Sequence, residues 1–283
     1  MAVENAPHPL ATYRACFPTA RVVDQPAQQV DWAELAAQVG PVDLLTAGPP
    51  CEPFTPAKAA RRVDPLSRLY ADPAGGLVLH TIRAIRALRP TAFAIENVVQ
   101  LTEGPLYREL NDLFRRAGYR AHFNVLRAEN NGTPSMRARL FITTREVAPG
   151  SRRPIPVREA IEDLEALDAD VPNHTPEPIP RSLRQRVSDL RPGRSLRWWK
   201  GATGKTYGTW TRLDYDQVAP TVKGSGRFIH PRFDRALTPR EHARLMGFPD
   251  GHVFHGPLKT QYDQAGEAVP PPLAEAVVRA ITP

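Results

Sequence analysis

One of the two cysteines of the chain lies in a segment suited to nucleophilic chemistry. Cys51 closes the run Gly48-Pro49-Pro50-Cys51, which directly follows the apolar residues 42–47. Those residues have the pattern of a buried strand, and in a doubly wound α/β sheet the carboxyl ends of the strands face the ligand. A thiol on a proline-rigid turn there is placed to act as a nucleophile, although a lone cysteine is more often a small buried hydrophobic residue.

A carboxylate follows a second short strand pattern. Residues 93–95 are apolar and lead into Glu96-Asn97-Val98. Because the carboxyl ends of parallel strands meet at one edge of a sheet, we expect Glu96 to point into the same crevice as Cys51. Buried there, a glutamate can hold a proton and act as a general acid. A surface glutamate at a strand end is the alternative interpretation.

Two arginines lead into a third strand pattern. Arg137 and Arg139 stand at alternate positions before the apolar residues 140–143. Alternate positions of a strand point to one side of the sheet. A pair of guanidinium groups on one side would suit an anion or the carbonyl oxygen of a base. A solvated strand edge would suit the pattern as well.

These motifs, together with two later segments, resemble the ordered motifs of the DNA (cytosine-5) methyltransferases. Five matches in the order and spacing of one family are far more specific than any single match. In chain order the matching segments are the nucleophile motif at 48–51, the Glu-Asn-Val motif at 96–98, the paired arginines at 137 and 139, the motif that follows the recognition domain at 230–250, and the closing motif at 264–271.

The resemblance implies an activity and a role for each catalytic residue. The family transfers a methyl group from S-adenosylmethionine to C5 of a cytosine that is flipped out of double-stranded DNA. Carried over to this chain, the thiolate of Cys51 adds to C6 of the ring. Glu96 hydrogen-bonds N3 and the exocyclic amine and helps to supply the proton. Arg139 contacts O2, and Arg137 helps to fix the loop and the backbone.

On the cofactor side the resemblance is less complete. The family opens with a strand and a Gly-rich turn that cradles the methionine end of S-adenosylmethionine, and this sequence has neither. It begins at what resembles the next strand, which Glu4 ends. Three residues depart from the usual types: Glu52 and Ser135 stand in place of Gln, and Glu267 in place of Asn. The residues expected at the cofactor are Glu4, Pro50, Leu77, Glu267 and Ala268.

Four explanations fit the missing opening segment. The reading frame begins too late, a second subunit supplies the strand and turn, the cofactor is modified or the chemistry differs, or the chain is a degenerate remnant that only binds DNA. The first two are favoured. The leading hypothesis is a DNA cytosine-5 methyltransferase in a restriction-modification or solitary bacterial setting. The alternatives are a DNA-binding or accessory subunit without independent activity and, with little support, a tRNA-directed family member.

The elements that must position these residues alternate along the chain. Short apolar runs predict strands, and apolar residues at helical spacing predict helices between and after them. This alternation predicts an α/β fold with a parallel, doubly wound sheet. The resemblance implies that this is a Rossmann-like methyltransferase sheet that lacks its first strand. The strands are expected at 42–47, 93–95 and 140–143, and the helices at 77–88, 106–117, from 239 onward and at 273–281.

Composition divides the chain into three parts. Residues 1–146 are expected to form the catalytic α/β domain, and 251–283 to return to it. Residues 147–250 are rich in Pro, Arg and Gly, which is typical of a small irregular target-recognition region with a hinge. Residues 52–74 are expected to be a mobile loop that closes over DNA. For the tryptophans of the middle region, core positions are favoured over DNA contacts; they are Trp198, Trp199 and Trp210.

Charge and cysteine content agree with a DNA-binding protein. The 283 residues include 37 Lys+Arg and 30 Asp+Glu, a net charge of +7, which favours a polyanionic partner such as double-stranded DNA. Two cysteines are no disulfide framework, and no Cys or His spacing suggests a metal site, so a reduced compartment and no metal are expected. We find neither a membrane-spanning run nor a secretory leader pattern, so no membrane partner and a cytoplasmic location are expected.

Overall fold

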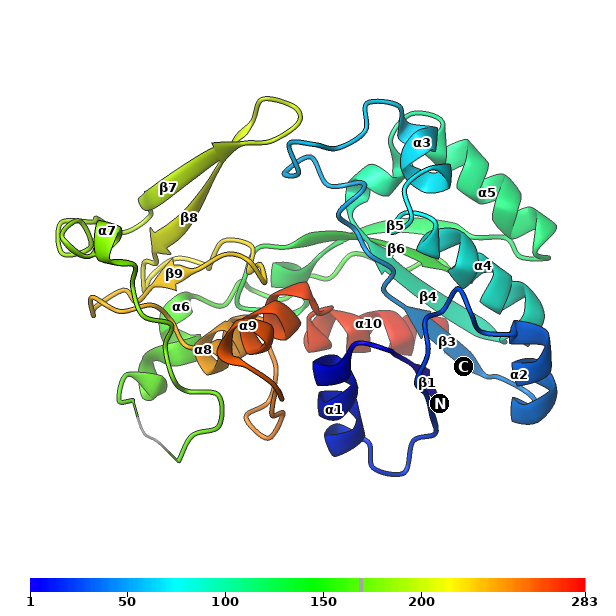
Figure 1. The fold of residues 1–283 in the computed structure, drawn as a ribbon, viewed down its shortest axis with the longest axis horizontal. Helices are drawn as coiled ribbons and strands as arrows, with labels where there is room; N and C mark the ends of the chain where they lie inside the picture. The colour runs from blue at the N-terminus through cyan, green and yellow to red at the C-terminus, as the bar shows by residue number, and fades with distance from the viewer. Residues whose placement is uncertain (168–169, 283) are drawn as a thin grey trace.

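A four-stranded mixed sheet carries the residues singled out in the sequence. The computed structural model describes residues 1–167 and 170–282 (Figure 1). Strands β3 and β4 are parallel, whereas β6 runs antiparallel to both of its neighbours. In spatial order the strands are β3 (Leu44–Ala47), β4 (Ala92–Asn97), β6 (Ala138–Thr143) and β5 (His122–Arg127).

The expectation of a parallel sheet is therefore wrong for β6, whereas β5 runs in the same direction as β3 and β4. β5 and β6 follow one another with only a short connection, which contains the 3-10 helix η2 (Ala128–Asn131). A parallel pairing needs a crossover connection of a dozen or more residues, so this connection favours an antiparallel pair. The α/β class itself is confirmed.

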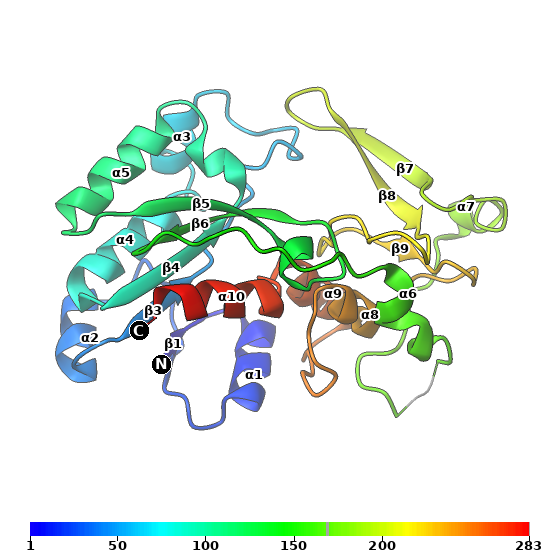
Figure 2. The same ribbon diagram turned by 180° about the vertical axis from the view of Figure 1, so that it is seen from behind.

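Helices cover both faces of this sheet, as Figures 1 and 2 show. All six residues of β4 are buried, and successive side chains point to opposite faces. Phe93 and Ile95 pack among residues of α4 (Leu77–Leu88) and α5 (Leu106–Arg116). Ala92 and Ala94 pack against α10 (Pro271–Ile281). The predicted helix at 77–88 is confirmed at its exact limits, and the C-terminal helix returns to the catalytic sheet.

The first forty residues form a second, two-stranded parallel sheet. It contains β1 (Ala2–Val3) and β2 (Val22–Val23), which α1 (Pro7–Cys16) connects. Helix α2 (Trp32–Val39) then leads into β3. Its N-terminus is capped by the side chain of Asp31, which accepts hydrogen bonds from the N–H groups of Ala33 and Glu34 at 3.0 Å each.

Right-handed connections place this small sheet beyond β3, on the side away from β4. Helix α2, between β2 and β3, packs against α4, which lies between β3 and β4, so the two helices cover the same face. When two right-handed crossover connections lie on the same face, each places its second strand on the same side of its first. Since β4 lies on one side of β3, β2 and its partner β1 lie on the other side. Within the described ranges no hydrogen bond joins β1 to β3. This reasoning leaves one strand position open between β1 and β3, and the absence of the first strand of the sheet stays a prediction.

The exposure of β3 reflects the open position. Leu44, Leu45 and Ala47 are only half-buried and Thr46 is exposed, whereas β4 beside them is buried throughout. Strands of parallel sheets are normally buried on both faces, and exposed strand edges are normally blunted by charges, prolines or bulges. The edge of β3 that faces away from β4 has none of these features, so its sequence is typical of a strand inside a sheet and not of an edge strand.

The middle of the chain folds around hydrophobic clusters of its own. An antiparallel hairpin of β7 (Ser195–Lys200) and β8 (Thr206–Arg212) is extended by β9 (Phe228–Ile229). The hairpin was not predicted, because its strands show no regular alternation of apolar and polar residues. Trp210 is 6% exposed and belongs to the core, as expected, but Trp198 is 58% exposed, so the core interpretation is wrong for Trp198.

Short helices complete the fold. Helix α8 (Pro239–Leu245) begins as predicted, with Thr238 at the N-cap. Thr238 Oγ1 accepts a hydrogen bond from the N–H of Glu241, and the Glu241 carboxylate accepts one from the N–H of Thr238. Helix α9 packs against α8 rather than on the sheet. No helix within the described residues is long and apolar enough to cross a membrane. The remaining elements are α3 (Pro65–Tyr70), η1 (Val99–Thr102), α6 (Val157–Ile161), η3 (Glu162–Leu164), α7 (Arg181–Arg184), α8 (Pro239–Leu245) and α9 (Leu258–Glu267).

A buried histidine makes stability depend on pH. His242 has no exposed surface, and burial lowers its pKa from an ordinary value of 6.5 to about 3. Below pH 6.5, His242 therefore binds a proton in the unfolded chain but stays neutral in the folded chain. The free energy of unfolding should fall by up to ~1.4 kcal/mol per pH unit for this group as pH drops from 6.5 toward 3.

Chemical denaturation at pH 4.5 and 7.5 measures this effect. The variant His242→Phe, which keeps a ring against Phe228 and Tyr262, should show a shallower loss of stability at low pH. The exposed His255→Asn is the matched control and should leave the loss unchanged. An equal loss of stability in wild type and His242→Phe would contradict the prediction.

Candidate active site

Cys51 lies on the turn that follows β3 and is tied to the neighbouring strand. Asn97, the last residue of β4, donates a hydrogen bond from Nδ2 to the carbonyl oxygen of Pro49 at 3.0 Å. The carbonyl of Cys51 in turn accepts bonds from the N–H groups of Phe54 and Thr55, both at 3.0 Å. The thiol therefore sits on a backbone that is held from both sides, at the carboxyl ends of two parallel strands.

Glu96 lies beside this turn and forms an ion pair with Arg139. Arg139 Nε is 2.7 Å from Glu96 Oε1, and both side chains are largely buried. A Cβ atom added to Gly48 would lie 3.9 Å from Glu96 Oε2, so the carboxyl group reaches the turn that carries Cys51. Burial raises the pKa of Glu96, against the opposing effect of Arg139 and Arg137. This carboxyl group binds a proton more readily than an exposed glutamate.

Arg137 is almost completely buried and binds backbone carbonyls from distant parts of the chain. Its guanidinium group donates to Val222 O at 2.8 Å, Gly266 O at 3.0 Å and Ala268 O at 3.2 Å. Its own N–H donates to Glu129 Oε2 at 3.0 Å. Burial lowers the pKa of Arg137 to about 9, so it remains charged at neutral pH. The residue fastens the strand β6 to the closing segment.

The electrostatic setting of Cys51 combines opposing effects. Burial is the largest cause of a raised pKa of the thiol, and the carboxylates of Glu52 and Glu96 raise it further. The guanidinium groups of Arg139 and Arg137 act in the opposite direction. Cys51, Glu96, Arg137 and Arg139 are thus close enough to influence one another, which is the arrangement that the sequence motifs led us to expect.

Sequence reasoning missed two supporting groups. Glu129 is 7% exposed and orients the backbone of Arg137, but it lies in a polar segment with no local signal of a buried role. The other group anchors the loop after Cys51. Arg68, which is 2% exposed, donates to the carbonyls of Arg62 and Val63 and pairs with Glu103 at 2.7 Å.

The residues expected at the cofactor are distributed around the open strand position and the closing segment. Glu4 follows β1, and its Oε1 accepts bonds from the N–H groups of Asn5 and Ala6 at 2.8 and 2.7 Å. Pro50 and Leu77 are half-buried. Glu267 is exposed at the end of α9, and Ala268 binds Arg137 through its carbonyl. Burial, followed by the charges of Asp263 and Glu52, raises the pKa of Glu267.

Comparison with known proteins decides the family. The family model for C-5 cytosine-specific DNA methylases matches residues 1–283. The chain belongs to this family. A putative type II methyltransferase of Methanocaldococcus jannaschii is 44% identical over 243 residues, which are 85% of this chain and 65% of that relative. A type II methyltransferase of Haemophilus parahaemolyticus is 31% identical over 306 residues, or 99% of this chain and 80% of the relative.

Solved structures share the fold of this C-5 cytosine-specific DNA methylase. A putative DNA modification methyltransferase encoded within an Escherichia coli prophage has a TM-score of 0.72 at 22% identity, over 99% of this chain and 92% of that one. A methyltransferase of Entamoeba histolytica has a TM-score of 0.70 at 15% identity, over 99% of this chain and 88% of that one. At these identities the likeness concerns the fold alone.

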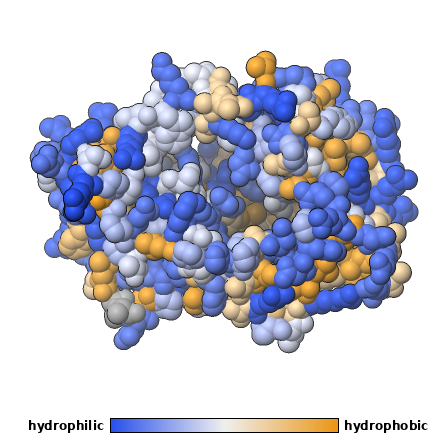
Figure 3. All heavy atoms as spheres, viewed as in Figure 1, coloured by the Kyte–Doolittle hydropathy of each residue, from blue (hydrophilic) through white to orange (hydrophobic). Residues whose placement is uncertain are grey.

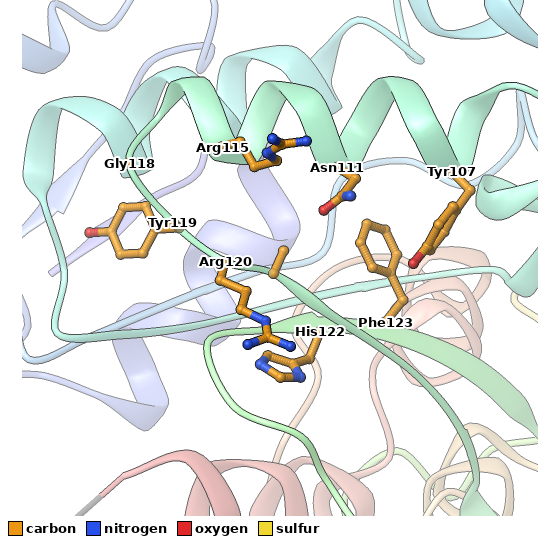
Figure 4. A pocket seen from close by; sticks show the side chains of 9 residues that line it. Tyr107, Asn111, Arg115, Gly118, Tyr119, Arg120, His122 and Phe123 are labelled. Atoms are coloured by element: carbon orange, nitrogen blue, oxygen red, sulfur yellow. The ribbon is translucent and has the colours of Figure 1, made fainter.

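Three further observations bear on where ligands can bind to the methylase chain. The space-filling view shows the surface hollowed between its two halves (Figure 3). A separate pocket of about 880 Å³ lies between α5 and the start of β5, as Figure 4 shows, and its lining includes Tyr107, Arg115 and Phe123. That pocket shares no residue with the Cys51 group. Among the described residues, no group of three or more His, Cys, Asp or Glu side chains could hold a metal ion.

The charges around Cys51 lead to a test on the thiol itself. Glu52→Gln removes the largest charge effect that raises the pKa of Cys51, so alkylation by iodoacetamide at pH 7.5 should become faster by roughly threefold. Arg139→Gln removes a charge that lowers this pKa and should slow the reaction. The rates are measured in a Cys16→Ser background, with Lys58→Gln as a surface control. Equal rates for the Glu52 and Arg139 variants would contradict the assignment.

Proposed function

We propose that the chain is a DNA cytosine-5 methyltransferase that acts through a covalent bond between Cys51 and C6 of a cytosine flipped out of double-stranded DNA. The observation that carries the proposal is the juxtaposition at the ends of β3 and β4. A thiol, a carboxyl group with a raised pKa and an arginine paired to that carboxyl group meet at the edge where doubly wound sheets bind ligands.

The chemistry explains why each of these groups is needed. C5 of cytosine is a poor nucleophile until a nucleophile adds to C6. The sulfur of Cys51 supplies the electron pair for the new C6–S bond, while Glu96 donates a proton to N3. C5 then takes the methyl group as its bond to the donor sulfur breaks. A base removes the C5 proton, the electrons of that bond re-form the C5–C6 double bond and expel the thiolate of Cys51, and N3 returns its proton to Glu96. Arg139, held by Glu96, is placed to bind O2 of the base, and Arg137 keeps the supporting backbone in place.

S-adenosylmethionine is the methyl donor that we propose, and the residues present fit part of it. Glu4 has one carboxylate oxygen, Oε2, that its bonds to Asn5 and Ala6 do not use, which suits a ribose hydroxyl. Pro50 and Leu77 offer half-buried apolar surface for the adenine. Glu267 and Ala268 are proposed to line the same site. When bound, the donor supplies an electrophilic methyl group on sulfur.

The proposed domain organisation follows the hydrophobic clusters. We assign 1–146 to catalysis, 147–250 to target recognition and the hinge, and 251–283 to a segment that returns to the catalytic domain. In support, the cluster around Leu213 and Val222 is separate from the clusters on either face of the main sheet. Methylation of cellular DNA would place the protein in the cytoplasm.

The covalent step gives the decisive test. A duplex with 5-fluorocytosine at the target position should form an adduct that survives denaturing electrophoresis when S-adenosylmethionine is present, because the fluorine cannot leave as the proton does. Cys51→Ala should abolish the adduct, and Cys16→Ala should leave it intact. Absence of an adduct under all cofactor and partner conditions would favour the alternative, a DNA-binding accessory subunit without its own activity.

The open strand position supports the expected second subunit. We propose that a strand from this subunit lies between β1 and β3 and that the turn after it holds the methionine end of the donor. Calorimetry with S-adenosylmethionine tests this. The chain alone should bind at least tenfold more weakly than the chain purified with the product of an adjacent reading frame. Stoichiometric micromolar binding by the chain alone would rule out the need for a second subunit.

A further inference from the structure

The β7–β8 hairpin contacts the loop after Cys51 across the hollow between the two halves. The N–H of Ala202 donates to the carbonyl of Pro56 at 2.9 Å. The indole Nε1–H of Trp199 donates to the carbonyl of Ala57 at 3.1 Å. In both Figure 1 and Figure 2 the tip of the hairpin approaches the loop that precedes α3. We call these two hydrogen bonds the latch.

The hairpin tip approaches the loop so closely that only glycine fits at one position. Gly201 is buried, and a Cβ atom added to it would lie 2.3 Å from the carbonyl oxygen of Pro56 and 2.7 Å from the ring of Tyr207. Real Cβ atoms do not approach backbone oxygen to this distance, so any larger side chain would push the hairpin away from the loop.

Trp199 is held in place by its neighbours. Its ring stacks on that of Tyr207, with a centroid distance of 5.6 Å. Lys223 Nζ lies 4.9 Å from the ring centroid of Trp199. The residue before Lys223 is Val222, whose carbonyl accepts a bond from Arg137. The donor side of the latch is therefore connected to a residue of the proposed active site.

The acceptor side is connected to Cys51 over a short stretch of chain. Phe54 is completely buried, and its carbonyl accepts a bond from Arg61 Nη1 at 2.9 Å. Phe54 and Thr55 are also bonded to the carbonyl of Cys51. A displacement at Pro56 thus acts within five residues of the nucleophile, on a segment that is otherwise firmly attached.

We propose that Trp199 and Gly201 are positioning residues that hold the loop after Cys51 closed over the active site. The latch bridges the two sides of the hollow, so it must open to admit a duplex and form again before the thiol can attack a flipped base. This inference rests on the proposed function for its role in the reaction, but the latch itself can be tested without any activity.

Limited digestion with trypsin reports whether the loop is held. Lys58 is exposed next to the latch. In the DNA-free chain, Trp199→Phe keeps the stacking on Tyr207 but removes the N–H donor. Cleavage after Lys58 should become about fivefold faster, as expected for the loss of one net hydrogen bond. Gly201→Ala should accelerate it at least as much.

Matched controls separate the latch from general loosening. Trp198→Phe changes the neighbouring tryptophan of the same hairpin, which is 58% exposed and binds only Ser195 O. Gly251→Ala adds a Cβ atom where nothing lies within 4 Å. Both should be cleaved at the wild-type rate. Wild-type rates for Trp199→Phe and Gly201→Ala as well would overturn the proposal, and Trp199→Phe keeps the test valid if Gly201→Ala fails to fold.

A second measurement addresses the role in the reaction. In single-turnover trapping on the 5-fluorocytosine duplex, Trp199→Phe should lower the rate of adduct formation several-fold while the Kd for DNA stays within twofold of wild type. A merely structural defect would weaken both. If wild type forms no adduct, the proposed function fails but the digestion still decides the latch. If adduct rates are equal although digestion differs, the latch has no role in the reaction and this inference is wrong.

Discussion

The buried guanidinium group of Arg137 is the interaction on which the site depends. Its bonds reach the carbonyls of Val222, Gly266 and Ala268, so the side chain of the residue just before β6 joins the main sheet, the middle region and the closing segment. None of these three acceptors carries a charge. The positive charge is instead stabilised by the carboxylates of Glu96 and Glu267. A buried charge with well-formed hydrogen bonds is costly to disturb, which makes this junction a fixed point for the groups around it.

Burial and the neighbouring arginines set how readily the Cys51 thiol and the Glu96 carboxyl group hold their protons. Burial raises the pKa of both Cys51 and Glu96, so without substrate the thiol stays protonated and the carboxyl group has an increased affinity for a proton. Arg139 opposes both shifts. A polar base that entered the site would change this balance by offering N3 and O2 as new partners. In the proposed reaction, the thiolate would therefore form only when a base is bound, and would not be exposed to solvent beforehand.

The proximity of the candidate site residues could be predicted from the sequence, and the reasons are physical. Cys51, Glu96 and the paired arginines lie within a few residues of strand ends, where local pattern and position coincide. The helix at 77–88 was predicted exactly because its apolar spacing matches one buried face. The antiparallel direction of β6 follows from the short connection between β5 and β6, and the hydrophobic periodicity of a strand does not predict its direction. The pairing of β7 with β8 and the hydrogen bond of buried Glu129 to Arg137 depend on contacts between separate segments. Local sequence patterns do not predict such contacts.

The close contact at Gly201 has a consequence for how recognition can change. A hairpin in a target-recognition region would ordinarily be free to vary, because new side chains at its surface alter only the DNA sequence that is bound. Here its tip also rests on the backbone of Pro56, with no room for a side chain. A transplanted hairpin from another family member would have to reproduce this glycine and the length of the turn. Sequence preference and catalytic turnover would therefore evolve together in this chain, as linked rather than independent traits.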